Sequence, residues 1–201
     1  MSDKIDTRKH ILEAARERFS HYGYAKTTMS EIARDCEMSA GNIYRFFASK
    51  LDIAEAMAVA FNNEKAESFR HIAYGDLAPP QRLYEFFVFA LNETYKKIDA
   101  EAKILEIAEI LRKERPEFLN GQLAEERVFI VKILTDGVDG GQFRSLDAPY
   151  VTAEMIQSSL MKFRFPQAYS NLKLDKLHYE LKGVVMLLLA GLSSTAEEPD
   201  I

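Results

Sequence analysis

The segment MSAGNIYRFFASKLDI, residues 38–53, combines side chains that can read DNA with small residues that let a helix approach it closely. An asparagine can make paired hydrogen bonds to adenine and an arginine to guanine, so Asn42 and Arg45 carry the chemistry of base readout. Residues 39–41 are small and keep the start of a helix narrow enough for the major groove. The segment predicts either a DNA-reading helix or a surface helix whose polar side chains meet only solvent.

The residues before and after this segment predict a compact unit of three helices. A first helix is expected from about Thr7 to Tyr22, where Gly23 supplies a C-terminal cap. Thr28 with Glu31 fits a capping box, while Ser39 and Ser49 can cap the next two helices. Helices this short depend on packing against the first one.

Within the candidate reading helix, Ile43 and Phe47 are expected to face Phe19, Ile32 and Ala33 in the interior. The outward side chains would be Asn42, Tyr44, Arg45 and Phe46. Phosphate contacts are expected from Thr27, Thr28, Ser39, Tyr44 and Lys50, helped by helix N-termini that attract anions.

The rest of the chain shows the 3.6-residue period and no alternating strand pattern, so the predicted fold is all-α. Later helices are expected at 49–74, 80–98, 100–113, 116–137, 149–165 and 174–192, with a clear break at YGDLAPP.

Composition limits the possible function classes. The 201 residues carry a net charge of −5, yet residues 1–50 hold nine Lys or Arg against seven Asp or Glu, so the basic end is the one with the candidate reading helix. One cysteine, Cys36, excludes an internal disulfide, and the first ten residues lack the apolar run of a secretory signal. A cytoplasmic protein is expected.

The last two predicted helices are the most apolar part of the chain. The apolar face of each helix is broader than one neighbouring helix of the same chain would cover. This favours a four-helix contact between two copies of the chain, and the alternative is that these residues form the core of a monomer. The expected interface residues are Ile156, Leu160, Phe163, Leu177, Leu181, Val184 and Leu188.

Aromatic residues in the predicted helices after residue 53 favour either a cavity for an apolar small molecule or an ordinary hydrophobic core. The expected lining residues are Phe61, Phe86, Phe89 and Tyr95. The four histidines lie far apart and no metal, nucleotide or nucleophile motif occurs, so neither an enzyme nor a metal or other cofactor is expected. Glu106 and Glu109 share a helix face and are interpreted as a solvated edge.

The string TTMSEIARDCEMSAGNIYRFFASKLDI resembles the helix-turn-helix of the tetracycline-repressor (TetR) family of bacterial transcription regulators, and ILEAARERFSHYGYAKTT is similar to its preceding helix. The resemblance covers roughly residues 8–60. It implies a homodimer with a DNA-binding domain at residues 1–53, and an effector-binding and dimerisation domain at residues 54–201. Phe46 departs from the histidine common at its place. The family's DNA contacts fall here on Thr28, Ser39, Ala40, Gly41, Asn42, Tyr44, Phe46 and Lys50.

The resulting hypothesis is a repressor released from a palindromic double-stranded DNA operator by a hydrophobic small molecule. An activator with the same DNA chemistry remains open. The competing class is a small-molecule carrier or helical enzyme that keeps the N-terminal unit as an interaction module.

Overall fold

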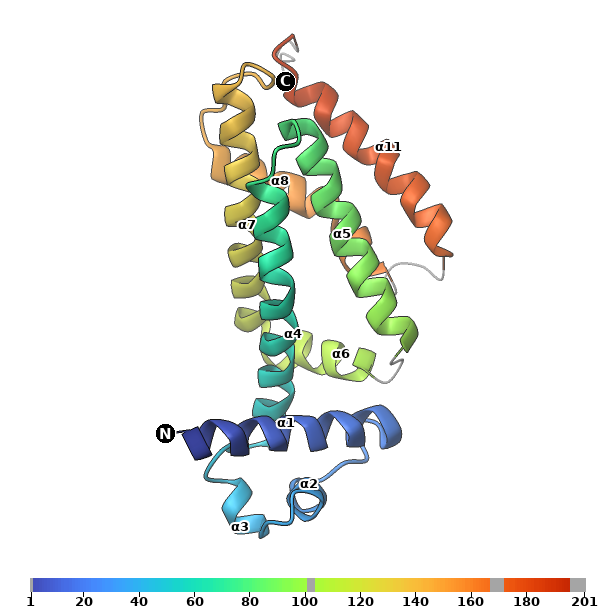
Figure 1. Cartoon of the computed structure of the whole chain (residues 1–201). Helices are drawn as coiled ribbons and strands as arrows, with labels where there is room; N and C mark the ends of the chain where they lie inside the picture. The colour runs from blue at the N-terminus through green and yellow to red at the C-terminus, as the bar shows by residue number, and fades with distance from the viewer. Residues whose placement is uncertain (1, 101–103, 167–171, 196–201) are drawn as a thin grey trace. The chain divides into compact units, whose positions relative to one another are not determined.

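The computed structural model describes residues 2–100, 104–166 and 172–195, and within these ranges the regular structure is helical, with one isolated β-bridge between Phe143 and Ser193 (Figure 1). The predicted all-α class is confirmed. The helices are α1 (Ser2–Tyr22), α2 (Met29–Asp35), α3 (Ala40–Ile43), α4 (Lys50–Ala73), α5 (Pro79–Ala100), α6 (Ile104–Glu114), α7 (Pro116–Asp139), α8 (Pro149–Ser159), α9 (Met161–Arg164) and α11 (Leu174–Leu192).

Packing divides the chain into two compact units. Unit 1 comprises residues 1–65 and 97–121, and unit 2 comprises residues 66–96 and 122–201. Helices α4, α5 and α7 each contribute residues to both units. The sequence predicts a DNA-binding domain that ends at residue 53 and an effector-binding domain that begins at residue 54. This division by function stays a prediction, because the two units are defined by packing alone.

The starts of α2, α3 and α4 are each determined by a local cap, as predicted. The Glu31 amide donates to the Thr28 hydroxyl at 3.3 Å, and the Thr28 amide donates to the Glu31 carboxylate at 2.9 Å. The amides of Asn42 and Asp52 donate to the hydroxyls of Ser39 and Ser49. Each cap satisfies donors that the helix start would leave unpaired.

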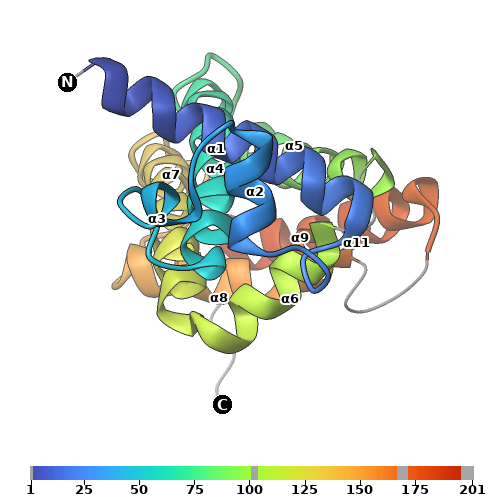
Figure 2. The ribbon, with the colours of Figure 1, turned by 90° about the horizontal axis from the view of Figure 1, so that it is seen from below.

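The core of unit 1 lies between α1, α2, α3, the first turns of α4 and α6. In Figure 1, α1 crosses the start of α4, and α2 and α3 lie on the other side of α1; Figure 2 looks onto α2 and α3. Helix α6 was not expected here, yet Ile107 and Leu111 are buried in this core. The other buried members include Ile11, Ala15, Phe19, Ile32, Ala33, Ile43, Phe47, Ile53 and Ala54.

The core of unit 2 is built from α5, α7, α8, α9, α11 and the end of α4. Polar side chains join these helices: Arg82 on α5 pairs with Asp136 on α7 at 2.8 Å, and Arg164 on α9 pairs with Glu126 on α7 at 2.5 Å. The fully buried members include Phe69, Phe86, Leu83, Leu91, Ile130, Ile133, Leu134, Leu177 and Leu181.

Two predicted helices differ in the structure. The helix expected over residues 149–165 breaks at Leu160, where the Ser159 hydroxyl donates to the Ile156 carbonyl and competes with the helical ladder. The helix expected after Ser39 is only four residues long, so Tyr44, Arg45 and Phe46 lie in the turn that follows α3.

Candidate nucleic-acid interface

A tight turn joins α2 to α3. Glu37 takes a left-handed φ of 55°, and the amides of Glu37 and Met38 donate to the carbonyls of Arg34 and Ala33 at 3.0 and 2.9 Å. This pattern is a Schellman motif, which satisfies the last carbonyls of a helix and reverses the chain. The turn therefore brings α3 back against α2 without leaving unpaired backbone groups.

The two sides of α3 and its following turn differ sharply in burial. Ile43 and Phe47 are buried in the unit 1 core together with Phe19, Ile32 and Ala33, which confirms their predicted inward orientation. Residues 39–41, Tyr44 and Arg45 are exposed, while Asn42 and Phe46 are half-buried. A Cβ built on Gly41 meets no atom within 4 Å. The outer side is thus free for a large ligand.

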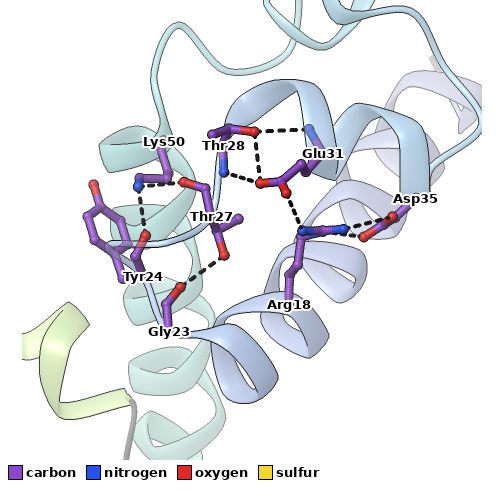
Figure 3. Close-up of polar contacts among 8 residues, drawn as sticks. All are labelled: Arg18, Gly23, Tyr24, Thr27, Thr28, Glu31, Asp35 and Lys50. Atoms are coloured by element: carbon purple, nitrogen blue, oxygen red, sulfur yellow. Dashed lines mark hydrogen bonds and ion pairs between the residues drawn. The ribbon is translucent and has the colours of Figure 1, made fainter.

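Arg18 anchors α2 to α1. Its Nε lies 2.5 Å from the Asp35 carboxylate and its Nη1 lies 3.2 Å from the Glu31 carboxylate, at the two ends of α2 (Figure 3). The bond from Arg18 holds the pKa of Asp35 below its usual range, and hydrogen bonds from Thr28 do the same for the pKa of Glu31. The carboxylates must therefore be ionised for α2 to be held fully in place.

This anchor predicts acid sensitivity. Both carboxyl pKa values are lower in the folded state, so their contribution to stability is complete above about pH 5 and is lost as the pH falls through the folded values. We expect Arg18→Met to lower the free energy of unfolding by about 1 kcal/mol at pH 7, discounted for the partly exposed carboxylates. The loss should shrink towards pH 3. Urea unfolding followed by circular dichroism measures it.

Lys9→Met, which removes an exposed charge from the same helix, is the control for the acid series. If Arg18→Met and Lys9→Met showed the same dependence of stability on pH, Arg18 would not anchor α2 through ionised carboxylates.

Two predicted phosphate ligands, Thr27 in the turn between α1 and α2 (residues 23–28) and Lys50 at the start of α4, have donors engaged within unit 1. Thr27 is 1% exposed, and its hydroxyl donates to the Gly23 carbonyl at 2.9 Å. The Lys50 ammonium lies 2.6 Å from the carbonyl oxygens of both Tyr24 and Thr27 (Figure 3). Thr27 is buried and Lys50 is half-buried, and both direct their donors at carbonyls of the turn, which need partners where water has little access.

The remaining cations near α2 and α3 are distributed on the surface. Lys26, Arg34 and Arg45 are exposed, whereas Arg8 donates to the Phe46 carbonyl at 2.7 Å and lies over the Phe47 ring. Lys26 and Arg34 were not among the predicted contacts. Their positions in the sequence could have indicated them, because Lys26 lies shortly before α2 and Arg34 lies within it.

Helix α6 contacts the interface residues in a way that sequence reasoning missed. The Glu106 carboxylate approaches the Ala25 amide at 3.4 Å and lies 3.0 Å from the position of a Cβ on Gly23, whose φ is 89°. Arg115, just after α6, pairs with Asp52 at 2.8 Å and Glu55 at 3.5 Å on α4. Glu106 is exposed, as expected for a solvated edge, and it also contacts the α1–α2 turn.

The residues expected at a dimer interface lie mostly in the core of unit 2. A side chain without exposed surface in one chain has none to bury against a second, so these five are corrected to core: Ile156, Leu160, Phe163, Leu177 and Leu181. Val184 and Leu188 are half-buried. The large apolar side chains that α8 and α11 leave exposed are Tyr150, Val151, Met155, Tyr179, Met186 and Leu187.

A pocket of about 450 Å³ lies in unit 2 between the end of α4 and one face of α5. Of the four predicted lining residues, only Phe89 borders it. Phe86 is buried and stacks on Phe69 with 4.3 Å between ring centroids, while Phe61 belongs to unit 1. The lining residues are His71, Ile72, Gly75, Leu77, Glu85, Val88, Phe89 and Asn92.

A capped helix, a tight turn and a short helix with a buried underside and an open outer face define a helix-turn-helix DNA-binding protein. Within the described ranges, no helix is long and apolar enough to cross a membrane, and no group of three or more acidic, histidine or cysteine side chains is placed to hold a metal.

Known proteins show the same elements. Residues 11–57 match the model of the bacterial regulatory proteins of the tetR family. The chain is 24% identical over 180 residues to the HTH-type transcriptional regulator YhgD of Bacillus subtilis (strain 168), covering 86% of this chain and 90% of YhgD. It is 25% identical over 147 residues to the HTH-type transcriptional repressor KstR2 of Mycobacterium tuberculosis, covering 72% and 73%.

The fold matches the crystal structure of FadR from Thermus thermophilus, a TetR family transcriptional repressor in complex with lauroyl-CoA. The TM-score is 0.71 at 20% identity, over 96% of this chain and 98% of that one. Residues 11–57 are thus similar to the DNA-binding segment of the tetR family of bacterial regulatory proteins, and the chain is a DNA-binding transcriptional regulator, not an enzyme.

Proposed function

We propose that the protein is a repressor that binds a palindromic operator as a homodimer and leaves it when a small molecule binds unit 2. The observation that carries the DNA-binding part is the open outer face of residues 39–45 above the buried Ile43 and Phe47. That KstR2 and FadR are named as repressors supports repression rather than activation. We place the protein in the cytoplasm, where its operator would lie.

The DNA-binding proposal is tested by selecting bound duplexes from a random pool and measuring their affinity at several salt concentrations. A dimer should enrich a palindrome, and log K should fall by about 0.9 per log unit of salt for each phosphate neutralised. A reporter gene placed behind the operator distinguishes repression from activation. A folded dimer, freed of bound small molecules by unfolding and refolding, that enriches no sequence would contradict the proposal.

The partner in the dimer is a second copy that packs on the exposed apolar side chains of α8 and α11. Val151 and Met155 are at least half exposed on α8, as are Tyr179, Met186 and Leu187 on α11. The glycines of α11, Gly183 and Gly191, each have open space where a Cβ would be, so a second helix can approach closely there. Exposed apolar side chains of this number on two helices support an association surface.

The effector is proposed to be a largely apolar molecule that occupies the α4–α5 pocket. Ile72, Leu77, Val88 and Phe89 provide apolar walls, whereas Asn92 provides a polar group whose Oδ1 lies 2.8 Å from His178 Nε2. Helix α4 continues from the pocket residues of unit 2 to Lys50 in unit 1, so it provides a covalent route for the signal. FadR binds lauroyl-CoA, which supports acyl-CoAs as the first effectors to test.

Val88→Trp is predicted to block the effector while leaving operator binding intact. The larger ring fills the pocket, and we expect the effector concentration for half-release of a fluorescent operator to rise at least about tenfold. Fluorescence anisotropy with lauroyl-CoA and other acyl-CoAs measures it. Val128→Trp, on an exposed position of α7 outside the pocket, is the control. Equal responses of both variants would place the effector site elsewhere.

A further inference from the structure

Lys50, the first residue of α4, has its ammonium group committed inside unit 1. Nζ lies 2.6 Å from the Tyr24 carbonyl oxygen and 2.6 Å from that of Thr27, and 4.2 Å from the centroid of the Tyr24 ring. An ammonium has three N–H donors; two meet carbonyls, and the ring face can take the remaining one. Figure 3 shows the side chain directed at the α1–α2 turn.

The two carbonyls have a structural need for this donor. They belong to the turn that follows Gly23, where α1 has ended, and Thr27 and Tyr24 are 1% and 9% exposed. Water therefore has little access to them, and a buried carbonyl without a partner costs free energy comparable to a lost hydrogen bond. A swing of Lys50 to an external phosphate would break both bonds. The Tyr24 carbonyl would keep only the Thr27 amide, at 3.2 Å, and the Thr27 carbonyl would lose its lysine donor in a site with little water.

The α1–α2 turn controls the placement of the two helices that follow it. Thr28, the last residue of the turn, caps α2 through its hydroxyl and amide, and α2 carries α3 through the Schellman turn at Glu37. From the other side, the Glu106 carboxylate of α6 lies against Gly23 and Ala25. Burial lowers the pKa of Lys50, while Glu106 and Glu31 act in the opposite direction.

We propose that Lys50 is a positioning residue that fastens the α1–α2 turn to the first turn of α4, and so sets the position of α2 and α3 on DNA, instead of binding a phosphate itself. The inference rests on the proposed operator binding. It also makes Lys50 the point at which a displacement of α4 reaches the helix-turn-helix.

The test compares operator binding of Lys50→Met, Lys50→Arg and Lys26→Met across a salt series. Lys26 is an exposed lysine of the same turn, so it controls for the loss of one positive charge. For Lys50→Met we expect about tenfold weaker binding with an unchanged salt slope, since no phosphate contact is lost. Lys50→Arg should also bind more weakly, because its planar guanidinium cannot reproduce the ammonium's bonds to both carbonyls.

Three results would overturn the proposal. A salt slope reduced by about 0.9 in Lys50→Met would identify a phosphate ligand. Full binding by Lys50→Arg would show that charge alone is required. Binding would be measured at a temperature at which circular dichroism shows Lys50→Met to be folded. If its operator affinity were unchanged there, Lys50 would contribute to the stability of the fold but not to operator binding. If the unsubstituted protein preferred no operator sequence, the result would contradict the proposed function and not the role of Lys50.

Discussion

Gly41→Asp is expected to weaken operator binding by at least about a hundredfold, through a negative charge placed against DNA phosphates and base edges, where like charges cost several kcal/mol. The fold should be unaffected, because a Cβ on Gly41 meets no atom within 4 Å. An aspartate in the first turn of a helix is also favourable to the helix dipole. The experiment therefore separates contact with DNA from stability.

Gly121→Asp is the matched control for this prediction. Gly121 is also exposed with open space around its Cβ position, but it lies on α7, outside the helix-turn-helix. Affinity is measured by anisotropy of the selected operator, stability by thermal unfolding and association by sedimentation velocity. Binding that survives Gly41→Asp unchanged would mean that α3 does not enter the groove.

Leu187→Glu is expected to convert the dimer to monomer at micromolar concentrations. Leu187 is 75% exposed on α11, and a two-fold interface places the substitution twice in the same contact, so two desolvated carboxylates oppose association. The dimer dissociation constant should rise at least about a hundredfold. Operator affinity should fall with it, because two linked half-site contacts become independent.

Val128→Glu provides the comparison, since Val128 is 56% exposed on α7 and lies outside the proposed dimer surface. A dilution series by sedimentation velocity, together with operator binding at each concentration, reports both effects. If Leu187→Glu remained a dimer while Val128→Glu dissociated, the association surface would lie on α7.

Each of the five substitutions tests a different property of the protein. The changes at Gly41 and Lys50 test operator binding, that at Leu187 tests dimer formation, that at Val88 tests effector binding, and that at Arg18 tests the acid stability of α2. Lys50 and Gly41 are expected to differ in kind: the first acts through the turn that holds α2, whereas the second contacts the groove directly.

The sequence alone was sufficient for the class of fold and for the local geometry of the helix-turn-helix. Thr28, Ser39 and Ser49 cap their helices as predicted, because each cap joins residues three positions apart and needs no distant partner. The inward positions of Ile43 and Phe47 likewise follow from helical period and the apolar character of the side chains.

Only the tertiary structure decided which polar and apolar side chains are free. Lys50 and Thr27 have the chemistry of phosphate ligands, but carbonyls of the α1–α2 turn use their donors. Glu106 meets Ala25 across 81 positions of sequence, a pairing that no local pattern encodes. Helix α11 is apolar on several sides, so periodicity could not choose which side the core would take. Packing in unit 2 covers Leu181 and leaves Leu187 exposed, because the neighbouring helices of one chain bury only one face.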